Sequence, residues 1–174
     1  MHNRYNAALA LGAGRARGVS DETSRKALAE FAGVPGRLEL VREVNGVKIY
    51  NDTTATTPEA TLAALAALRQ SSGQNQNLIL ILGGADKGLD MSALLAKLPE
   101  VKRVVLLAGT GTERIKNDIR NTSIYGSISD AVQAAMDAAE AGDTILFSPA
   151  FASFGMFKNE YDRGDQFNAI IEKL

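Results

Sequence analysis

Hydrophobic residues in the second half of the chain fall into short continuous runs instead of alternating with polar residues. The clearest runs are Leu78–Leu82, Val104–Ala108 and Ile145–Phe147, and a shorter strand is predicted near Ser123–Tyr125. Strands of a parallel sheet have this pattern because helices cover both of its faces. The runs therefore predict a mostly parallel sheet buried between two layers of helices.

Segments with apolar residues at helical spacing separate these runs, and each has start and stop signals. Leu62, Leu65 and Leu68 share one face of the first predicted helix. The predicted boundary residues are Thr57-Pro58 at the start of the first helix, Asp90 and Pro99 for the second, Ser129 and Gly142 for the third, and about Gly164 for the last. The alternation of strand and helix predicts a three-layer α/β domain.

A β-hairpin is predicted before the first of these helices. The runs Leu38–Val44 and Val47–Tyr50 flank Asn45-Gly46, a dipeptide that tolerates the positive φ angles of a two-residue turn.

The chain begins with two predicted helices. Asn3 is expected to cap the first, and Ser20 the second, which Gly33 would end. Pro35 and Gly36 then mark a break. The three-layer domain is thus expected from about residue 38, preceded by a short helical segment that looks like the end of another domain.

Composition excludes several classes of protein. The 174 residues carry 19 basic and 20 acidic side chains, with no cysteine and a single histidine, His2. Disulfides and thiolate metal sites are excluded, and one terminal histidine argues against zinc. Nothing in the charge pattern indicates nucleic acid, no apolar run is long enough to span a membrane, and no leader is visible. We expect a cytoplasmic protein.

Four polar segments follow the predicted strands, and ligands of open parallel sheets collect beyond the carboxyl ends of strands. The segments are Asn51–Thr57, Gly83–Gly88, Gly109–Thr112 and Ser148–Ser153. The first places an acid and four hydroxyls before a helix N-terminus, which suits either oxygen ligands or plain helix capping. Gly83–Gly88, with Lys87, is either an anion-binding turn or an ordinary tight turn, and taken alone the ordinary turn is favoured. Gly109–Thr112 is interpreted as a turn.

Two catalytic signatures are missing from the sequence. It contains no G-x-x-x-x-G-K-[ST] phosphate loop, and His2 has no serine or cysteine partner for nucleophilic catalysis. Catalytic machinery is therefore absent or incomplete in this chain.

Taken together and in order, these segments resemble the Mur ligases, and among them those that add D-glutamate to UDP-N-acetylmuramoyl-L-alanine. The blocks that carry the resemblance are His2–Ala7, Gly33–Glu39, Asn51–Thr61 and Phe147–Phe167. The last block is the most specific, and the four together cover nearly the whole chain.

The resemblance implies a three-domain ligase that uses ATP and Mg²⁺ to activate a carboxylate as an acyl phosphate, which an amine then attacks. Residues 1–37 would be the helical tail of the central ATPase domain, and residues 38–174 the complete Rossmann-like C-terminal domain. That domain brings the amino-acid substrate, so the chain alone is expected to be inactive and to hold no bound cofactor. Its expected partners are small molecules: D-glutamate, ATP and UDP-N-acetylmuramoyl-L-alanine.

The resemblance also implies roles for single residues. Asn6 would contact the adenine, Arg37 the phosphates and Asp52 the ribose of ATP. The carboxylates of D-glutamate would be held by Thr56, Lys87 and Ser153, as a dicarboxylate needs a cation and several donors. No catalytic residue and no metal ligand is expected in this chain.

Three positions depart from the family pattern. Thr54 stands where some relatives carry lysine, and Gly36 replaces a histidine often found before the arginine. Glu160 occupies the place of an aromatic residue that packs on the amino acid, for which Tyr161 is a possible substitute. A carboxylate there would repel D-glutamate unless it turned away.

Two alternative functions remain open. One is a stand-alone Rossmann-like domain that binds a nucleotide or acidic metabolite, although such a domain would have no use for the Asn3–Asn6 and Arg37 matches. The other is a related ligase, such as a folylpolyglutamate synthase, against which the block beginning at Phe147 argues.

Overall fold

The computed structural model describes residues 2–72 and 76–174, and the side chains of residues 2–4 and 70–72 are outside this description. The chain divides into two compact units, the first ending at Gly33 and the second running from Val34 to Leu174. Each unit is described by itself below.

The first unit is a pair of helices, α1 (His2–Ala16) and α2 (Asp21–Ala29). Ser20 caps α2 as predicted, because its side chain accepts a hydrogen bond from the Thr23 N–H. The prediction that Asn3 caps α1 is wrong, since the helix already includes His2.

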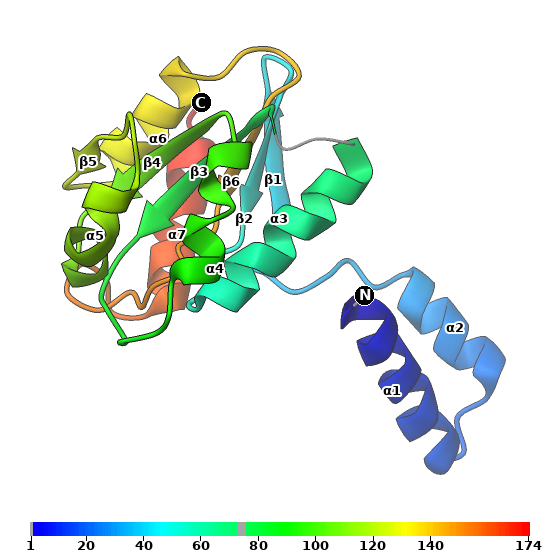
Figure 1. Cartoon of the computed structure of the whole chain (residues 1–174). Coiled ribbons are helices and arrows are strands. Elements are labelled where there is room, and N and C mark those ends of the chain that lie inside the picture. The colour runs from blue at the N-terminus through cyan, green and yellow to red at the C-terminus, as the bar shows by residue number, and fades with distance from the viewer. Residues whose placement is uncertain (1, 73–75) are drawn as a thin grey trace. The chain divides into compact units, whose positions relative to one another are not determined.

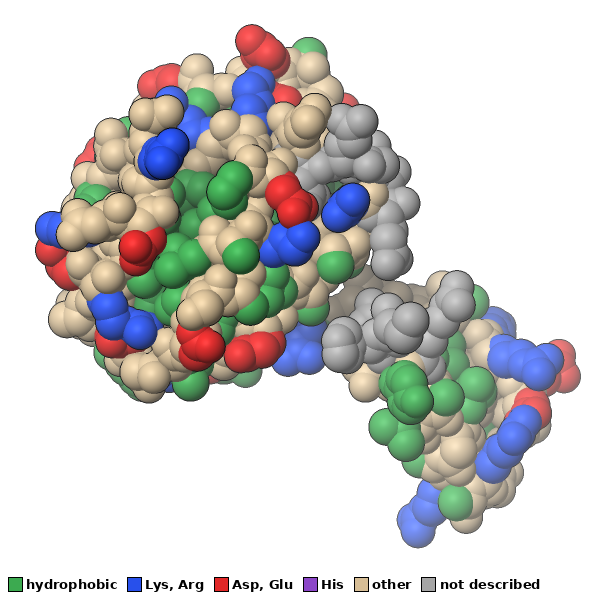
Figure 2. Space-filling view, viewed as in Figure 1, with side chains coloured by type: hydrophobic (Ala, Val, Ile, Leu, Met, Phe, Trp, Pro, Cys, Tyr) green, Lys and Arg blue, Asp and Glu red, His purple; other side chains and the backbone are tan. Residues whose placement is uncertain are grey.

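No side chain of this unit, among those described from residue 5 to residue 33, is buried. Apolar side chains lie exposed on its surface (Figure 2), and the largest of them are Tyr5, Leu9 and Phe31. The helix pair therefore has no hydrophobic core of its own.

The second unit is built on one six-stranded sheet with the order β1-β2-β6-β3-β4-β5. The strands are β1 (Glu39–Val44), β2 (Val47–Asn51), β3 (Leu78–Gly83), β4 (Arg103–Leu107), β5 (Ile124–Tyr125) and β6 (Thr144–Phe147). Only the β1–β2 pair is antiparallel among these neighbours. Its turn is the predicted Asn45-Gly46, with φ angles of 52° and 79°, as a type I′ turn requires.

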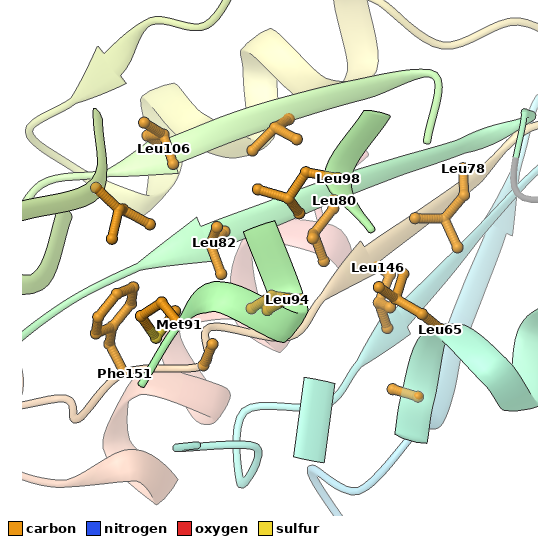
Figure 3. Packing of buried hydrophobic residues seen from close by; sticks show 14 of the residues in the cluster. Leu65, Leu78, Leu80, Leu82, Met91, Leu94, Leu98, Leu106, Leu146 and Phe151 are labelled. Carbon is orange, nitrogen blue, oxygen red and sulfur yellow. The ribbon is translucent and has the colours of Figure 1, made fainter. Parts of the chain in front are cut away.

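Helices cover both faces of the sheet (Figure 1). They are α3 (Pro58–Ser72), α4 (Ser92–Leu95), η1 (Leu98–Glu100), α5 (Thr110–Ile115), η2 (Lys116–Asp118), α6 (Ile128–Asp137) and α7 (Glu160–Ile171). Alternate residues of β3 point to opposite faces, so Leu80 packs with Leu65 and Leu94 of α3 and α4 (Figure 3), whereas Ile81 belongs to the cluster formed with α6 and α7. The predicted three-layer α/β fold with a mostly parallel sheet is confirmed.

Several predicted helix boundaries are wrong by a few residues. Ser127, and not Ser129, caps α6 by accepting from the Asp130 N–H. Asn159 caps α7, which therefore starts before Gly164. Asp90 accepts from the Ser92 N–H but lies one residue before the N-cap of α4.

Two further differences concern whole elements. The single helix predicted between Asp90 and Pro99 is split into α4 and the short helix η1, which has its proline in the first turn. The segment interpreted as a turn at Gly109–Thr112 is the start of helix α5.

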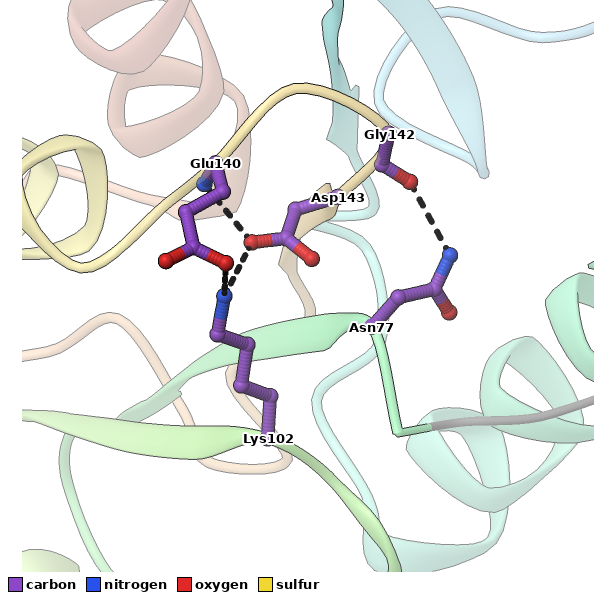
Figure 4. Close-up of polar contacts among 5 residues, drawn as sticks. All are labelled: Asn77, Lys102, Glu140, Gly142 and Asp143. Atoms are coloured by element: carbon purple, nitrogen blue, oxygen red, sulfur yellow. Dashed lines mark hydrogen bonds and ion pairs between the residues drawn. The ribbon is translucent and has the colours of Figure 1, made fainter.

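Polar contacts join the amino ends of three central strands (Figure 4). Asp143, directly before β6, accepts from the Lys102 ammonium at 2.6 Å and from the Glu140 N–H at 2.7 Å. Asn77, directly before β3, donates to the Gly142 carbonyl. These contacts hold the amino ends of the strands together, on the side of the sheet opposite their carboxyl ends. Within the described residues, no helix is long and apolar enough to cross a membrane.

Candidate functional site

Hydrogen bonds connect the four polar segments at the carboxyl ends of the strands. Ala150 N–H donates to the Ala55 carbonyl, which joins the segments after β6 and β2. Ala85 and Ala152 form an antiparallel bridge that joins the segments after β3 and β6. Gly111 N–H donates to the Gly84 carbonyl and adds the segment after β4. The predicted gathering of these segments at one edge is therefore observed.

Asp52 follows β2 and is buried, with 5% of its surface exposed. One carboxylate oxygen accepts from the Leu38 N–H at 2.9 Å, and the other accepts from the Ser148 hydroxyl at 2.7 Å. The Ser148 hydroxyl also lies 2.9 Å from the hydroxyl of Thr61, in α3. Asp52 thus connects the start of the hairpin to the segment that follows β6.

Burial disfavours the charged form of a carboxyl group, and it raises the pKa of Asp52 to about 6. The hydrogen bonds from Ser148 and Leu38 and the charge of Arg37 act in the opposite direction and lower this pKa. Burial outweighs them, so the ionised form of Asp52 is present in the folded protein at a cost in free energy.

Thr56 and Lys87 come from different segments and touch each other. The Lys87 ammonium donates to the Thr56 hydroxyl at 3.0 Å. Lys87 is exposed, and it forms no ion pair with any residue that the structure describes. Its neighbour Asp86 is paired instead with Arg114, at 2.9 Å. Lys87 therefore presents an uncompensated positive charge beside a hydroxyl group.

Helix α5 holds the segment that carries Lys87. The Thr110 hydroxyl accepts from the Asp86 N–H at 2.9 Å. Arg114 donates to the Asp86 carboxylate and to the Leu89 carbonyl, both at 2.9 Å, so it binds the chain on both sides of Lys87. Gly111 allows α5 to pack closely against the segment after β6, because a Cβ atom there would overlap the ring of Phe151.

Ser153 lies in the segment after β6 and is 3% exposed. Its hydroxyl has no hydrogen-bond partner among the described residues, which is unusual because buried polar side chains are normally paired. The adjacent residue, Phe154, is 68% exposed. Ser153 therefore offers a buried donor, free of partners in the described part of the chain, next to the surface.

The remaining predicted residues, Arg37 and Asn6, lie in different units. Arg37 is exposed, and it lies between Gly36 and Leu38, which both bond to the segment after β2. Asn6 is an exposed residue of α1, in the first unit. In the second unit the charge of Arg37 acts on Asp52, and Lys87 contacts Thr56 of the same segment as Asp52, whereas Asn6 belongs to the other unit.

The structure shows the contacts of the three positions that depart from the family pattern. Thr54 donates to the Gly36 carbonyl from both its N–H and its hydroxyl, each at 3.0 Å, so two of these positions contact each other directly. Glu160 is half-buried at the start of α7, where its carbonyl accepts from the Thr53 hydroxyl. Tyr161 is 61% exposed.

Sequence reasoning missed several residues that build this region. They are Ser148 and Thr61 beside Asp52, Thr110 and Arg114 beside Asp86, and the buried Arg163 of α7. Ser148 and Arg163 do lie in the block of residues 147–167 that carries the family resemblance. No pattern in a single sequence indicates that an arginine of a helix is buried.

No group of three or more histidine, aspartate and glutamate side chains that could hold a metal ion occurs in the described part of the chain.

Comparison with known proteins identifies relatives of nearly the whole chain. A ligase named UDP-N-acetylmuramoylalanine–D-glutamate ligase from a Roseiflexus species is 42% identical over 99% of this chain. A protein of the same name from Aquifex aeolicus is 36% identical, also over 99% of this chain. The chain spans only 38% and 41% of the lengths of these two relatives.

Solved structures share the fold. The UDP-N-acetylmuramate-alanine ligase MurC from Thermotoga maritima superposes with a TM-score of 0.74 at 16% identity, covering 99% of this chain and 38% of that one. FolC from E. coli, solved in complex with ADP, gives a TM-score of 0.71 at 25% identity, with 97% and 39% covered.

A protein-family model described as "Mur ligase, glutamate ligase domain" matches residues 36–151. The match begins beside the boundary between the two units and includes the segments that carry Asp52, Thr56 and Lys87. The chain belongs to the Mur ligase family.

Proposed function

We propose that this chain supplies the amino-acid-binding part of an ATP-dependent ligase that adds D-glutamate to UDP-N-acetylmuramoyl-L-alanine in peptidoglycan synthesis. The observation that carries this proposal is the contact between Thr56 and Lys87, a cation without an ion pair among the described residues. The buried hydroxyl of Ser153, also without a partner among those residues, lies in the same set of connected segments. The names of the relatives at 42% and 36% identity support D-glutamate as the amino acid.

The chemistry of these three side chains suits a dicarboxylate. Lys87 supplies a positive charge that no described acid neutralises. Thr56 and Ser153 supply hydroxyl donors, and a hydrogen bond to a charged group contributes about 1.5–3 kcal/mol. The cation and one hydroxyl would hold one carboxylate, and the buried hydroxyl of Ser153 would orient the other.

We further propose that Asn6, Arg37 and Asp52 contact ATP in the complete ligase, which uses ATP with Mg²⁺ to activate the acceptor carboxylate. Arg37 is exposed and available to a phosphate. Asp52 fits less readily, because it is buried and both of its oxygens already accept hydrogen bonds. Ribose would reach it through a lone pair that these bonds leave free, since a carboxylate has about four acceptor sites. The described residues contain no cluster of acidic ligands, so Mg²⁺ would be held by other parts of the ligase.

Residues 1–37 are proposed to be the helical tail of the central ATPase domain, with residues 38–174 as the Rossmann-like C-terminal domain. The lack of any buried side chain in the described part of residues 5–33 supports this division, because helices of a folded domain bury an apolar face. The chain also spans about two fifths of its curated relatives. We therefore expect no ligase activity from the chain alone, and we propose a cytoplasmic ligase.

The test is a titration of the isotope-labelled chain with sodium D-glutamate, followed by nuclear magnetic resonance of its backbone amides. We expect saturable shifts near Thr56, Lys87 and Ser153, weaker binding of L-glutamate, and no comparable shifts with sodium chloride at the same ionic strength. Lys87→Ala should abolish the saturable component. Equal shifts with both enantiomers, or none with D-glutamate, would refute the proposal. Saturable binding of a different acidic metabolite alone would favour a stand-alone binding domain.

A further inference from the structure

Arg163 is the largest of the fully buried side chains, with 0% of its surface exposed. It lies in the first turn of α7, beyond the cap residue Asn159. Arginine is almost never fully buried unless it is paired with an acid. The contacts of this side chain therefore need an explanation.

All hydrogen bonds of the guanidinium go to two of the polar segments. Its Nε donates to the Thr53 hydroxyl at 3.1 Å, and its Nη2 donates to the Thr53 carbonyl at 2.7 Å. Its Nη1 donates to the Phe151 carbonyl at 3.2 Å. Thr53 is three residues before Thr56, and Phe151 is two residues before Ser153. One side chain thus ties the Thr56 segment to the Ser153 segment.

Helix α7, which carries Arg163, packs closely against the segment that contains Thr53. The neighbouring Gly164 has no room for a side chain, since a Cβ atom there would lie 2.6 Å from the Thr53 methyl group. Thr53 also donates through its hydroxyl to the Glu160 carbonyl at 2.9 Å. The position of Thr53 is therefore fixed from both the side chains and the backbone of α7.

The guanidinium of Arg163 forms no ion pair within the described part of the chain, although the charge of Glu160 acts on it. Each of its three acceptors is neutral, and it makes no ion pair with any residue in the described part of the chain. Its guanidinium also lies over the ring of Phe147, 5.9 Å from the ring centre. Burial lowers the pKa of Arg163 to about 10, and the charge of Glu160 opposes this change. The group thus remains charged at neutral pH, and a buried, unpaired charge favours an incoming anion.

We propose that Arg163 is a positioning residue for the anion site of Thr56, Lys87 and Ser153. It fixes the two segments that carry the hydroxyl donors, and its charge, which forms no ion pair in the described part of the chain, favours a dicarboxylate over a neutral ligand. Since the side chain is fully buried, it acts through these segments and through its field, without touching the ligand. This inference rests on the proposed D-glutamate function. It adds Arg163 to the residues that determine binding of the dicarboxylate.

The experiment compares the D-glutamate affinity of the unaltered chain with that of Arg163→Gln, Arg163→Lys and a matched control, Arg42→Gln. Arg42 also donates to two backbone carbonyls, those of Ile171 and Glu172, but at the far end of α7. We expect Arg42→Gln to bind D-glutamate as the unaltered chain does. Arg163→Gln should bind at least about tenfold more weakly, whereas Arg163→Lys, which keeps the charge but not the fork of donors, should lose only a few-fold.

The affinities of these variants test the role of Arg163. Unchanged affinity in Arg163→Gln overturns the inference, and equal losses in the glutamine and lysine variants reduce Arg163 to an ordinary structural residue. Should Arg163→Gln not fold, Thr53→Val and Thr53→Ser replace it. The valine removes the acceptor of Nε and should weaken binding, whereas the serine keeps the acceptor and should not; equal affinities overturn the inference. Failure of the unaltered chain to bind refutes the D-glutamate function itself, a result distinct from any difference among variants.

Discussion

Asp52→Asn is expected to stabilise the second unit at neutral pH. Burial raises the pKa of Asp52 from the ordinary 3.8 to about 6. Because one pKa unit corresponds to about 1.4 kcal/mol, keeping this carboxylate ionised costs the folded state about 3 kcal/mol. Asparagine removes the charge and retains both contacts, since its oxygen can accept from Leu38 N–H and its amide can donate to the Ser148 hydroxyl.

The same shift fixes the sign of the pH dependence. Between pH 3.8 and about 6 the unfolded state has released this proton while the folded state still holds it. The stability that the protonated Asp52 provides is complete below the lower value and is lost as the pH rises through the higher one. The free energy of unfolding of the variant should thus exceed that of the unaltered chain by an amount that grows to about 3 kcal/mol at pH 7.

Urea denaturation followed by far-ultraviolet circular dichroism measures this difference at several pH values. Asp21, Asp90, Glu100 and Asp162 have lowered pKa values, and their contributions cancel when the two proteins are compared at one pH. Asp165→Asn, at an exposed position, serves as the control and should change nothing. A variant less stable than the unaltered chain, or a stability difference independent of pH, would refute the reasoning.

Three further predictions address the site, the opposite edge and the packing between segments. In a complete ligase, Lys87→Ala should impair the use of D-glutamate much more than that of ATP in steady-state assays, and equal losses contradict the assigned role. Asp143→Ala should lower the free energy of unfolding by about 1–2 kcal/mol, with no change in ligand affinity, because the part-buried Glu140 N–H loses its acceptor and Lys102 keeps the Glu140 carboxylate but loses that of Asp143. Gly111→Ala should cost about 1–3 kcal/mol by overlap with Phe151, whereas Gly12→Ala, with open space around it, should not destabilise α1; similar effects in urea melts would contradict this packing.

The sequence was sufficient for the strands but not for their order. Continuous apolar runs predict β3, β4 and β6 because buried strands need apolar residues on both faces. Nothing local indicates that β6, the last strand in the chain, pairs between β2 and β3. That order depends on packing between distant segments, which hydrophobic periodicity does not encode.

Errors at helix starts arose where two capping residues compete. Ser127 precedes α6 and Ser129 is its second residue, but only Ser127 has an acid three residues later, Asp130, to whose carboxylate its hydroxyl donates. Asn159 and Asp162 have the same spacing at the start of α7. Ser127 with Asp130 resembles the capping-box pattern, which favours the observed start of α6, whereas Asn159 is a common N-cap residue that lies outside that pattern. Helix α5 was missed because glycines at 109 and 111 resemble a turn.

The sequence suggested polar residues for the candidate site but not the residues that hold them in place. Lys87 and Thr56 were predicted because they follow strands and match the family pattern, and in the structure the Lys87 ammonium donates to the Thr56 hydroxyl at 3.0 Å. Arg114 and Arg163 could not be assigned, because a charged residue of an amphipathic helix is normally solvated. The packing of α7 against the strand ends buries Arg163, whereas Arg114 of α5 stays exposed and is held by its hydrogen bonds to Asp86 and Leu89.

The most direct test of the account is to replace the matching C-terminal segment of the Roseiflexus relative with this chain. The hybrid is then assayed for release of phosphate from ATP in the presence of UDP-N-acetylmuramoyl-L-alanine and Mg²⁺. The account predicts that release depends on D-glutamate and that Lys87→Ala removes this dependence. A folded hybrid that binds ATP but uses a different amino acid, or is indifferent to D-glutamate, would contradict it.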